Sequence, residues 1–203
     1  MTPSKCIKCK TFPCTDIDKK VYLVPLIELN PGKIKLVMVS EAPPVDKQDY
    51  FYAAGTPNYL QTTLQAFNDA GIPVKTMADI LKLGVYITTA VKCAKTQYAI
   101  SLDTIKTCSR ILESELALFP TAKVYMLMGD VAIKSMNAIA KRTAGLRVIP
   151  NGSTYKIRKQ QFYFNDIRVF PSYLQTGGNY LIEKAKRRMI AEDIQTAFNL
   201  LKS

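Results

Sequence analysis

Four short apolar runs, separated by helical patterns, constrain the fold of this chain more than any other feature. The runs are rich in Val, Ile, Leu and Met and have the length of buried strands: 34–39, 85–91, 124–128 and 167–170. Apolar residues at helical spacing predict helices over 59–70, 77–83, 102–119, 131–142 and 181–201. Because strand and helix alternate, the sequence predicts an α/β sandwich around a mostly parallel four-stranded sheet.

A functional site is expected at the carboxyl ends of the predicted strands, because sheets of this kind bind ligands there. These ends fall at 40–44, 88–95, 129–130 and 170–178. In the first, Pro43 and Pro44 stop the strand just after the carboxylate of Glu41. In the last helix we predict a buried stripe that leaves the basic residues outward, made of Ile182, Ala185, Met189, Ala197 and Leu201.

The charge of the chain favours a polyanionic partner. Its 28 Lys and Arg against 16 Asp and Glu give a formal net charge of +12, which creates a positive field suited to nucleic acid. The alternative is that the basic composition only keeps the protein soluble. The sequence contains no histidine, which excludes histidine-based zinc sites, Ser-His-Asp triads and imidazole general bases.

The length of 203 residues is typical of one domain, and we predict a single domain over 1–203 with a cysteine-bearing flap at about 1–20. No run approaches the roughly 18 apolar residues that cross a bilayer. The first thirty residues hold three cysteines and several charges where a signal peptide would need an apolar segment. We therefore expect a cytoplasmic monomer that does not enter membranes.

The five cysteines indicate metal binding more than disulfides, because thiols stay reduced in the cytoplasm. Cys6 and Cys9 form one close pair, and Cys93 and Cys108 form a second with 14 residues between them. Four thiolates suit a [4Fe–4S] cluster or a structural zinc, and the wide second gap favours iron–sulfur. Two alternatives stay open: Cys93 and Cys108 are small buried apolar residues, or Cys14 replaces Cys6 as a ligand.

The order of the motifs along the chain resembles that of the iron–sulfur (family 4-like) uracil-DNA glycosylases, over most of the chain from Cys6 to Leu201. The landmarks are Cys6-x-x-Cys9, Ser40-Glu41-Ala42-Pro43-Pro44, Thr88-Thr89-Ala90-Val91-Lys92-Cys93, Cys108 and Phe170-Pro171-Ser172-Tyr173-Leu174. The resemblance implies a three-layer α/β/α sandwich, a [4Fe–4S] cluster, DNA as the partner, and a repair glycosylase that removes uracil or another deaminated base.

This chain departs from the family pattern at two positions that would read the base. The family's asparagine, which holds the amide edge of uracil, falls on Thr89, and its late histidine falls on Phe170. Glycines of the first family motif fall on Ser40 and Pro44. The chain therefore resembles a divergent member. A binding protein of the same fold that does not cleave is the second hypothesis, and an unrelated zinc domain that binds RNA or protein is the third.

The resemblance and the chemistry of glycosidic cleavage together suggest roles for individual residues. Cleavage builds positive charge on the sugar and negative charge on the base, so Glu41 is the expected catalytic carboxylate. Ala42 and Thr89 would lie at the base, where Thr89 offers one hydroxyl in place of an amide. Phe51 is the expected stacking platform, with Tyr52 second. The alternatives are a surface acid for Glu41 and a core position for Phe51.

The late motif and the last helix complete the predicted site. Phe170 lies where a donor to the base is expected and cannot donate, so backbone N–H groups at Ser172 would stabilise the leaving base. Ser172 could equally contact a phosphate. Leu174, ahead of the Gly177-Gly178 pair, is the expected minor-groove wedge, with core packing as the alternative. The predicted phosphate contacts on the last helix are Lys184, Arg187 and Arg188.

Overall fold

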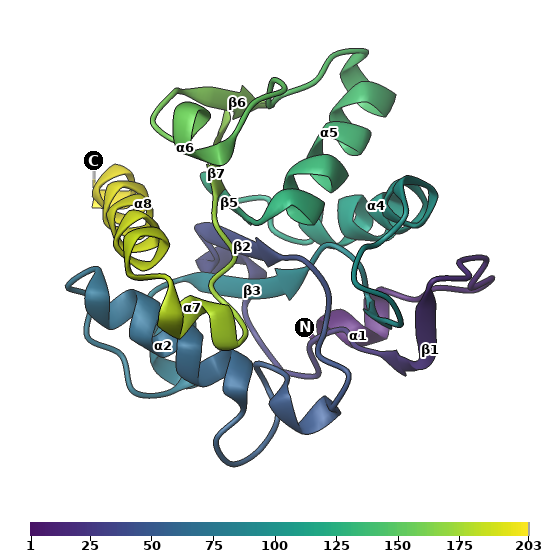
Figure 1. Ribbon diagram of the computed structural model, residues 1–203, viewed down its shortest axis with the longest axis horizontal. Helices are drawn as coiled ribbons and strands as arrows, with labels where there is room; N and C mark the ends of the chain where they lie inside the picture. The colour runs from purple at the N-terminus through teal and green to yellow at the C-terminus, as the bar shows by residue number, and fades with distance from the viewer. Residues whose placement is uncertain (203) are drawn as a thin grey trace.

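The computed structural model describes residues 1–202, with residues 178 and 179 described by their backbone alone, and its centre is a five-stranded sheet (Figure 1). The strands lie in the order β3-β2-β5-β7-β6. Their bounds are β2 Leu36–Ser40, β3 Val85–Thr89, β5 Val124–Met128, β6 Phe162–Phe164 and β7 Ile167–Ser172. The four predicted strands are confirmed as the parallel part of the sheet. The count of four was wrong, because the short strand β6 pairs antiparallel with β7 at the edge.

Helices cover both faces of this sheet, which confirms the predicted three-layer α/β/α sandwich (Figure 1). One face carries α2 (Asn58–Asp69), α3 (Met77–Lys82) and α8 (Lys184–Lys202), and the other carries α4 (Leu102–Leu116) and α5 (Asp130–Ala144). The shorter helices are α1 (Pro3–Cys6), α6 (Thr154–Ile157), α7 (Gly178–Ile182) and the 3-10 turns η1 (Pro31–Lys33) and η2 (Lys47–Asp49).

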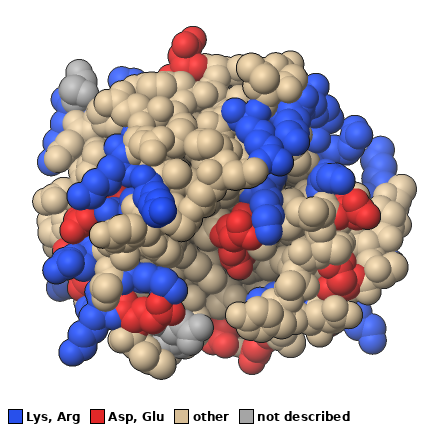
Figure 2. All heavy atoms as spheres, turned by 45° about the horizontal axis from the view of Figure 1, so that its top comes forward, with Lys and Arg blue, Asp and Glu red and all other residues tan. Residues whose placement is uncertain are grey.

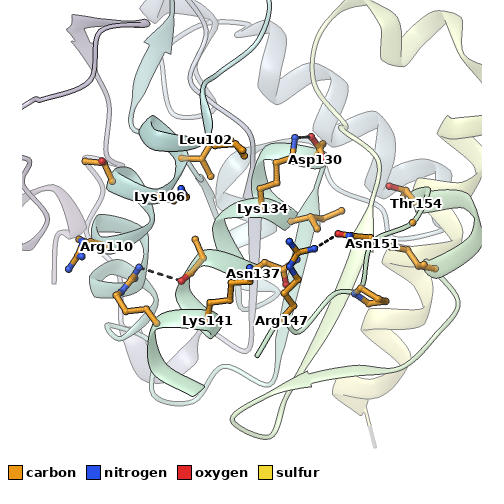
Figure 3. A pocket seen from close by; sticks show the side chains of 18 residues that line it. Leu102, Lys106, Arg110, Asp130, Lys134, Asn137, Lys141, Arg147, Asn151 and Thr154 are labelled. Atoms are coloured by element: carbon orange, nitrogen blue, oxygen red, sulfur yellow. Dashed lines mark hydrogen bonds and ion pairs between the residues drawn. The ribbon is translucent and has the colours of Figure 1, made fainter. Parts of the chain in front are cut away.

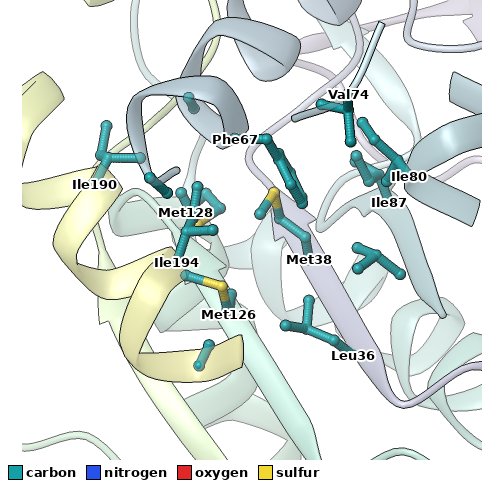
Figure 4. Packing of buried hydrophobic residues seen from close by; sticks show 14 of the residues in the cluster. Leu36, Met38, Phe67, Val74, Ile80, Ile87, Met126, Met128, Ile190 and Ile194 are labelled. Carbon is teal, nitrogen blue, oxygen red and sulfur yellow. The ribbon is translucent and has the colours of Figure 1, made fainter. Parts of the chain in front are cut away.

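Side chains alternate between the two layers along each strand. Met38 and Ile87 face α2 and α8, and they pack with Phe67 and Ile194 in the first core (Figure 4). Val37, Val39 and Tyr86 face α4 and α5 in the second core. Because every residue of β2, β3 and β5 is buried, these strands read as continuous apolar runs, as parallel strands between two helical layers do.

Local sequence signals explain where the helices start and stop. Thr76 and Asp79 form a reciprocal capping box at the start of α3, and the hydroxyl of Ser101 accepts a hydrogen bond from the Thr104 N–H at the start of α4. Gly145 ends α5 in the left-handed conformation, at φ 74°. These caps fix where α3 and α4 begin and where α5 ends.

The strand order changes direction at β2, which lies between β3 and β5. The segments that follow β2 and β5 therefore diverge at a topological switch point, where open α/β sheets bind their ligands. Glu41 follows β2 and Gly129 follows β5. The fold thus places these two residues side by side at the carboxyl edge.

The N-terminal segment attaches to the domain through a separate two-stranded sheet. Strand β1 (Ile17–Tyr22) pairs antiparallel with β4 (Cys93–Lys95). The carboxylate of Asp16 accepts hydrogen bonds from the Ser101 N–H at 2.6 Å and from the Thr104 hydroxyl at the start of α4. Burial raises the pKa of Asp16, and these hydrogen bonds outweigh it, so the net pKa is lowered.

The last predicted helix differs from the structure in two ways. It is broken at Glu183 into α7 and α8, and its buried stripe consists of Ile190, Ile194, Ala197 and Phe198. Of the stripe expected from the sequence, Ile182 and Ala185 are exposed, because the break resets the helical phase and the first turns of α8 project past the core. In residues 1–202, none of the helices combines the length and the apolar character that a membrane span requires.

Candidate active site

A cavity of about 520 Å³ opens at the carboxyl edge of the sheet. The ends of three neighbouring strands and the segments after them contribute to it: Glu41 after β2, Gly129 and Asp130 after β5, and Ser172, Tyr173, Leu174, Thr176 and Gly177 at the end of β7. Tyr98, Thr154 and side chains of α7 and α8 complete the lining. We refer to this cavity as the active-site pocket. It collects residues from the predicted strand ends at 40–44, 129–130 and 170–178.

The carboxylate of Glu41 is held by the start of α5. Its Oε1 accepts a hydrogen bond from the Val131 N–H at 3.3 Å, where the helix dipole also favours a negative charge. The backbone carbonyl of Glu41 accepts from the Val91 N–H at 2.9 Å. The N–H of Gly129 in turn donates to the carbonyl of Ser172 at 3.0 Å. The three strand-end segments are therefore tied together around one carboxylate.

Ser172 lies at the pocket, but its hydroxyl is engaged in a buried network. It donates to Asp193 on α8 at 2.6 Å, and Arg158 pairs with the same carboxylate at 2.7 Å. Burial raises the pKa of Asp193, although Ser172 and Arg158 both act to lower it. This network joins β7, α6 and α8 beneath the pocket, so the Ser172 hydroxyl anchors the pocket wall.

Four buried polar atoms on the α2 and α8 side of the sheet have no hydrogen-bond partner within the described residues: Ser40 Oγ, Thr89 Oγ1, Gln175 Oε1 and Tyr50 Oη. Ser40 and Thr89 are register partners in β2 and β3, on the face that carries Met38 and Ile87. Gln175 reaches the same face, since its amide nitrogen contacts the Met38 sulfur at 3.4 Å. Unsatisfied buried polar groups are costly, so a cluster of them indicates a site for a polar ligand.

Of this cluster, the sequence predicted Thr89 and missed Ser40, Tyr50 and Gln175. Ser40 and Gln175 directly adjoin lining residues of the pocket, Glu41 on one side and Leu174 and Thr176 on the other. The position of Gln175 one residue after the predicted wedge was the available signal. A buried glutamine in a loop does not change the hydrophobic periodicity of the sequence. The periodicity therefore could not identify Gln175.

The segment after β3 is fixed by a fully buried ion pair. Lys92 pairs with Glu115 of α4, and both side chains are 0% exposed. The ammonium group also donates to the Thr88 hydroxyl at 2.9 Å and to the carbonyl of Thr89. Glu115 accepts further hydrogen bonds from Tyr86 at 2.7 Å and from Thr88. This network holds the backbone of Thr89 in place.

Of the residues predicted to contact the base, Ser172 lines the pocket, whereas Thr89, Phe51, Phe170 and Ala42 lie outside the lining. Phe51 is fully buried in the first core, because η2 turns the aromatic segment inward and its ring packs edge-on against Tyr59 at 5.3 Å between centroids. Phe170 is buried in the same core beneath the guanidinium of Arg168. Ala42 packs in a third cluster with Cys93 and Cys108. The aromatic residues that line the pocket are Tyr98, Tyr173 and Tyr180.

The predicted DNA contacts separate into different environments. Leu174 lines the pocket and is half-buried. Lys184 and Arg188 are exposed on α8. Arg187 forms a two-pronged ion pair with Asp69 on α2, with the second contact at 2.9 Å, and this pair lowers the pKa of Asp69. Arg187 therefore joins two helices in place of the free phosphate contact that was predicted.

Four cysteines surround a second, small pocket beneath the N-terminal segment. Its lining includes Cys9, Cys14, Cys93 and Cys108, with apolar side chains around them. Of the predicted ligands, Cys9, Cys93 and Cys108 line this pocket, and so does Cys14, the alternative to Cys6. Cys6 is exposed at the end of α1. A positive φ of 44° at Phe12 turns the chain between Cys9 and Cys14 so that both reach the pocket.

The donor set at this pocket fits a thiolate-ligated metal group in number and chemistry. Burial raises the pKa of the Cys93 thiol to about 12 and that of Cys108 to about 11, so thiolates form there only beside a compensating positive charge. Within residues 1–202, the side chains do not yet converge into a group of three or more that could hold a metal ion.

Comparisons with known proteins agree with this architecture. The model of the uracil DNA glycosylase superfamily matches residues 27–194, which is most of the chain. The type-5 uracil-DNA glycosylase of Thermus thermophilus is 28% identical over 114 residues, which cover 54% of this chain and 52% of that relative. The match thus spans about half the length of the relative. Because the family match extends over far more than half of the chain, this protein belongs to the uracil DNA glycosylase superfamily.

Proposed function

We propose that this protein is a DNA-repair glycosylase that hydrolyses the N-glycosidic bond of uracil or another deaminated base flipped out of DNA. The observation that carries the proposal is the position of Glu41, a carboxylate held at a pocket of about 520 Å³. Ser40, the residue before it, has a buried hydroxyl without a partner in the described part of the chain. Flipping brings the base out of the stack, which is least costly at a mismatched or damaged pair.

Glu41 is proposed to stabilise the positive charge that develops on the sugar and to orient the attacking water. A fixed carboxylate can act in both ways without rearranging during the reaction. The hydrogen bond from Val131 and the tie between Gly129 and Ser172 hold it at the pocket. The water oxygen bonds to the sugar carbon as the bond to the base breaks, and the base departs with the bonding electrons. The Glu41 carboxylate takes up the proton released by the water, and that proton finally neutralises the base anion.

Gln175, Thr89 and Ser40 are proposed to read the base edge. The glutamine amide offers a donor and an acceptor together, as the family's asparagine does, and its buried Oε1 has no partner among the side chains that the structure describes. Its amide nitrogen contacts the thioether of Met38, which is a weak acceptor. Uracil presents both N–H and carbonyl groups along its edge, so these side chains suit a base with mixed donors and acceptors.

Cys9, Cys14, Cys93 and Cys108 are proposed as the ligands of a [4Fe–4S] cluster, with a structural zinc as the alternative. When bound, such a group would cross-link the N-terminal segment, β4 and α4, and its binding energy would add to folding stability. The support is the shared pocket of these four thiols, which lies apart from Glu41. The cluster is thus proposed to act on architecture and not on cleavage.

DNA is the proposed partner, and the protein is proposed to act as a cytoplasmic monomer formed by one domain with an N-terminal flap. The formal net charge of +12 supports a polyanionic ligand. A second function is favoured by the replacement of asparagine and histidine at Thr89 and Phe170. In that case the protein binds damaged or single-stranded DNA without cleaving it.

One experiment separates these functions. The full chain, purified anaerobically, is incubated with labelled duplexes that carry uracil or hypoxanthine, and abasic sites are cut with alkali. We expect strand scission by the wild type and a loss of about 10²-fold or more in Glu41→Gln, with DNA affinity nearly unchanged. Absence of scission on either base would favour the binding function. Zinc without iron in the purified protein would contradict the cluster.

A further inference from the structure

A third cavity, larger than the active-site pocket at about 830 Å³, runs between α4, α5 and the segment 147–157 (Figure 3). Of the described side chains that line it, six are cationic and one is a carboxylate. Figure 2 shows Lys and Arg side chains gathered on the face of the molecule that carries these two helices. We call this cavity the basic groove, and its cationic residues are Lys106, Arg110, Lys134, Lys141, Arg142 and Arg147.

Half of this positive charge is free of acidic partners. Lys134 pairs with Asp130, Arg142 pairs with Glu113 at 2.5 Å, and Lys106 lies 3.5 Å from Asp103. No carboxylate among the side chains that the structure describes pairs with the three remaining cations. These are Arg110, Lys141 and Arg147, all of which are exposed. The groove therefore presents an uncompensated charge to solvent.

The groove is preformed, because hydrogen bonds join the segments that line it. The amide of Asn137 on α5 donates to the carbonyl of Ile149 at 2.9 Å and accepts from the Ile149 N–H at 2.9 Å. This two-way hydrogen bond fastens the segment after α5 to the helix itself. Arg142 also donates to Ser109 of α4 at 3.2 Å, which joins the two helices along the floor. A ligand would meet prearranged charges and would not have to order them.

The basic groove continues into the active-site pocket. Asp130 and Thr154 line both cavities, so the two spaces meet at the start of α5. Lys106 and Arg110 lie four residues apart on α4, which places them about 6 Å apart along the helix axis. Rows of cations at such intervals suit the repeated phosphates of an extended strand. A strand that leaves the pocket on this side would enter the groove.

We propose that the basic groove binds the sugar–phosphate backbone of the DNA strand that flanks the flipped nucleotide, in single-stranded form. This inference rests on the proposed function in that the pocket supplies the point from which the strand departs. Arg110, Lys141 and Arg147 contact phosphates, while exposed apolar surface at Leu102 lies against the sugars. The groove extends the binding site beyond the base and makes affinity depend on the length of the strand.

The test compares two triple variants of the full chain. Arg110→Ala/Lys141→Ala/Arg147→Ala removes three charges from the groove. Lys33→Ala/Lys75→Ala/Lys82→Ala removes three exposed charges that precede β2 and β3 and line neither the groove nor the active-site pocket, and serves as the control of equal charge change. Fluorescence anisotropy gives the affinity for single strands of about twenty and about five nucleotides, with and without a central uracil, across a series of salt concentrations.

We expect the groove variant to bind the long strand at least about fivefold more weakly, with a salt slope reduced by about 2, because each phosphate contact on a single strand contributes about 0.7. Its affinity for the short uracil strand, and excision from it, should match those of the wild type. Equal affinity of wild type and groove variant for the long strand would overturn the inference, as would an equal loss in the control variant. Competition by polyglutamate as strong as that by DNA would also overturn it.

This outcome is separable from the proposed glycosylase activity. If the wild type releases no base from any substrate but still binds long strands through the groove, the activity is refuted and the groove inference stands. If the wild type cleaves and the groove variant binds long strands normally, the groove inference is refuted and the activity stands.

Discussion

The carboxylate of Glu41 lies directly against the α-carbon of Gly129. A Cβ at that position would be 2.5 Å from Oε1 and 2.9 Å from Cγ of Glu41. Gly129 also has φ 100° and ψ 170°, a backbone conformation that is essentially restricted to glycine. The placement of the proposed catalytic carboxylate therefore depends on the absence of one methyl group on the next strand of the sheet.

Gly129→Ala should displace Glu41 and reduce base excision by about 10²-fold or more, with a stability loss of about 1–3 kcal/mol. Gly71→Ala is the matched control, since Gly71 has φ 75° and open space around its α-carbon. The free energy of unfolding of that control should fall by about 1 kcal/mol, and its excision activity should be unchanged. Excision assays and urea unfolding measure the two effects. Full activity in Gly129→Ala would contradict the role of this contact.

Gln175→Leu should abolish discrimination between uracil and other bases without destabilising the protein. The substitution removes a buried amide oxygen that has no partner among the residues described, so stability should stay equal or rise slightly. Thr89→Val removes a buried hydroxyl of the same kind and should behave similarly. Relative excision rates on a panel of damaged bases and thermal unfolding check both. A marked loss of stability together with unchanged base preference would indicate a structural role.

Cys14→Ser should lose bound iron and the broad absorbance of a cluster, whereas Cys6→Ser should keep both. The reason is that Cys14 lines the pocket with Cys9, Cys93 and Cys108, and Cys6 is exposed at the end of α1. Iron analysis and the absorbance spectrum of anaerobically purified variants give the answer directly. Loss of iron in Cys6→Ser and retention of iron in Cys14→Ser would instead support Cys6 as the fourth ligand, as predicted from the sequence.

Glu115→Ala should destabilise the protein by about 3–5 kcal/mol, because it leaves the ammonium of Lys92 buried without its counter-charge. Glu113→Ala lies on the same helix and removes a more exposed ion pair with Arg142, so it should cost about 1 kcal/mol or less. Urea unfolding of the two variants provides the comparison. Similar losses in both would mean that the buried pair contributes little.

Asp69→Asn should remove a contribution to stability that depends on pH in a defined direction. The ion pair with Arg187 lowers the pKa of Asp69. The contribution is therefore complete above the unfolded value of about 3.9 and disappears as the pH falls through the lower folded value. Unfolding curves from neutral to acidic pH should converge for wild type and variant at the acidic end. A difference that is constant with pH would contradict the ion pair.

The sequence predicted the parallel strands because they are buried on both faces and therefore read as unbroken apolar runs. It missed β6, which has three residues and lies at an edge, and it missed the pairing of β1 with β4, which joins segments about 75 residues apart. The break at Glu183 also escaped detection, because polar and apolar residues continue at helical spacing across it. Local hydrophobic patterns in the sequence indicate which segments are buried, but they do not indicate which distant segments pair as strands.

The same distinction applies to the site. Glu41 was predicted because two prolines after a strand mark a strand end in the sequence itself. Gln175 and Cys14 were not chosen, since their positions depend on how loops fold onto the domain. Arg187 was expected to be exposed to solvent as a phosphate contact. Its ion pair with Asp69 could not be foreseen, because the pair depends on the packing of α2 against α8.

The attachment of the N-terminal segment imposes an order on events during synthesis. Asp16 is hydrogen-bonded to Thr104, 88 residues further along the chain, and β1 pairs with β4 over a similar separation. At ribosomal speeds this gap corresponds to roughly 4–20 s in which Cys9 and Cys14 have emerged but their pocket does not exist. The N-terminal thiols of a nascent chain are thus open to oxidants and stray metal ions until the second half of the pocket is translated.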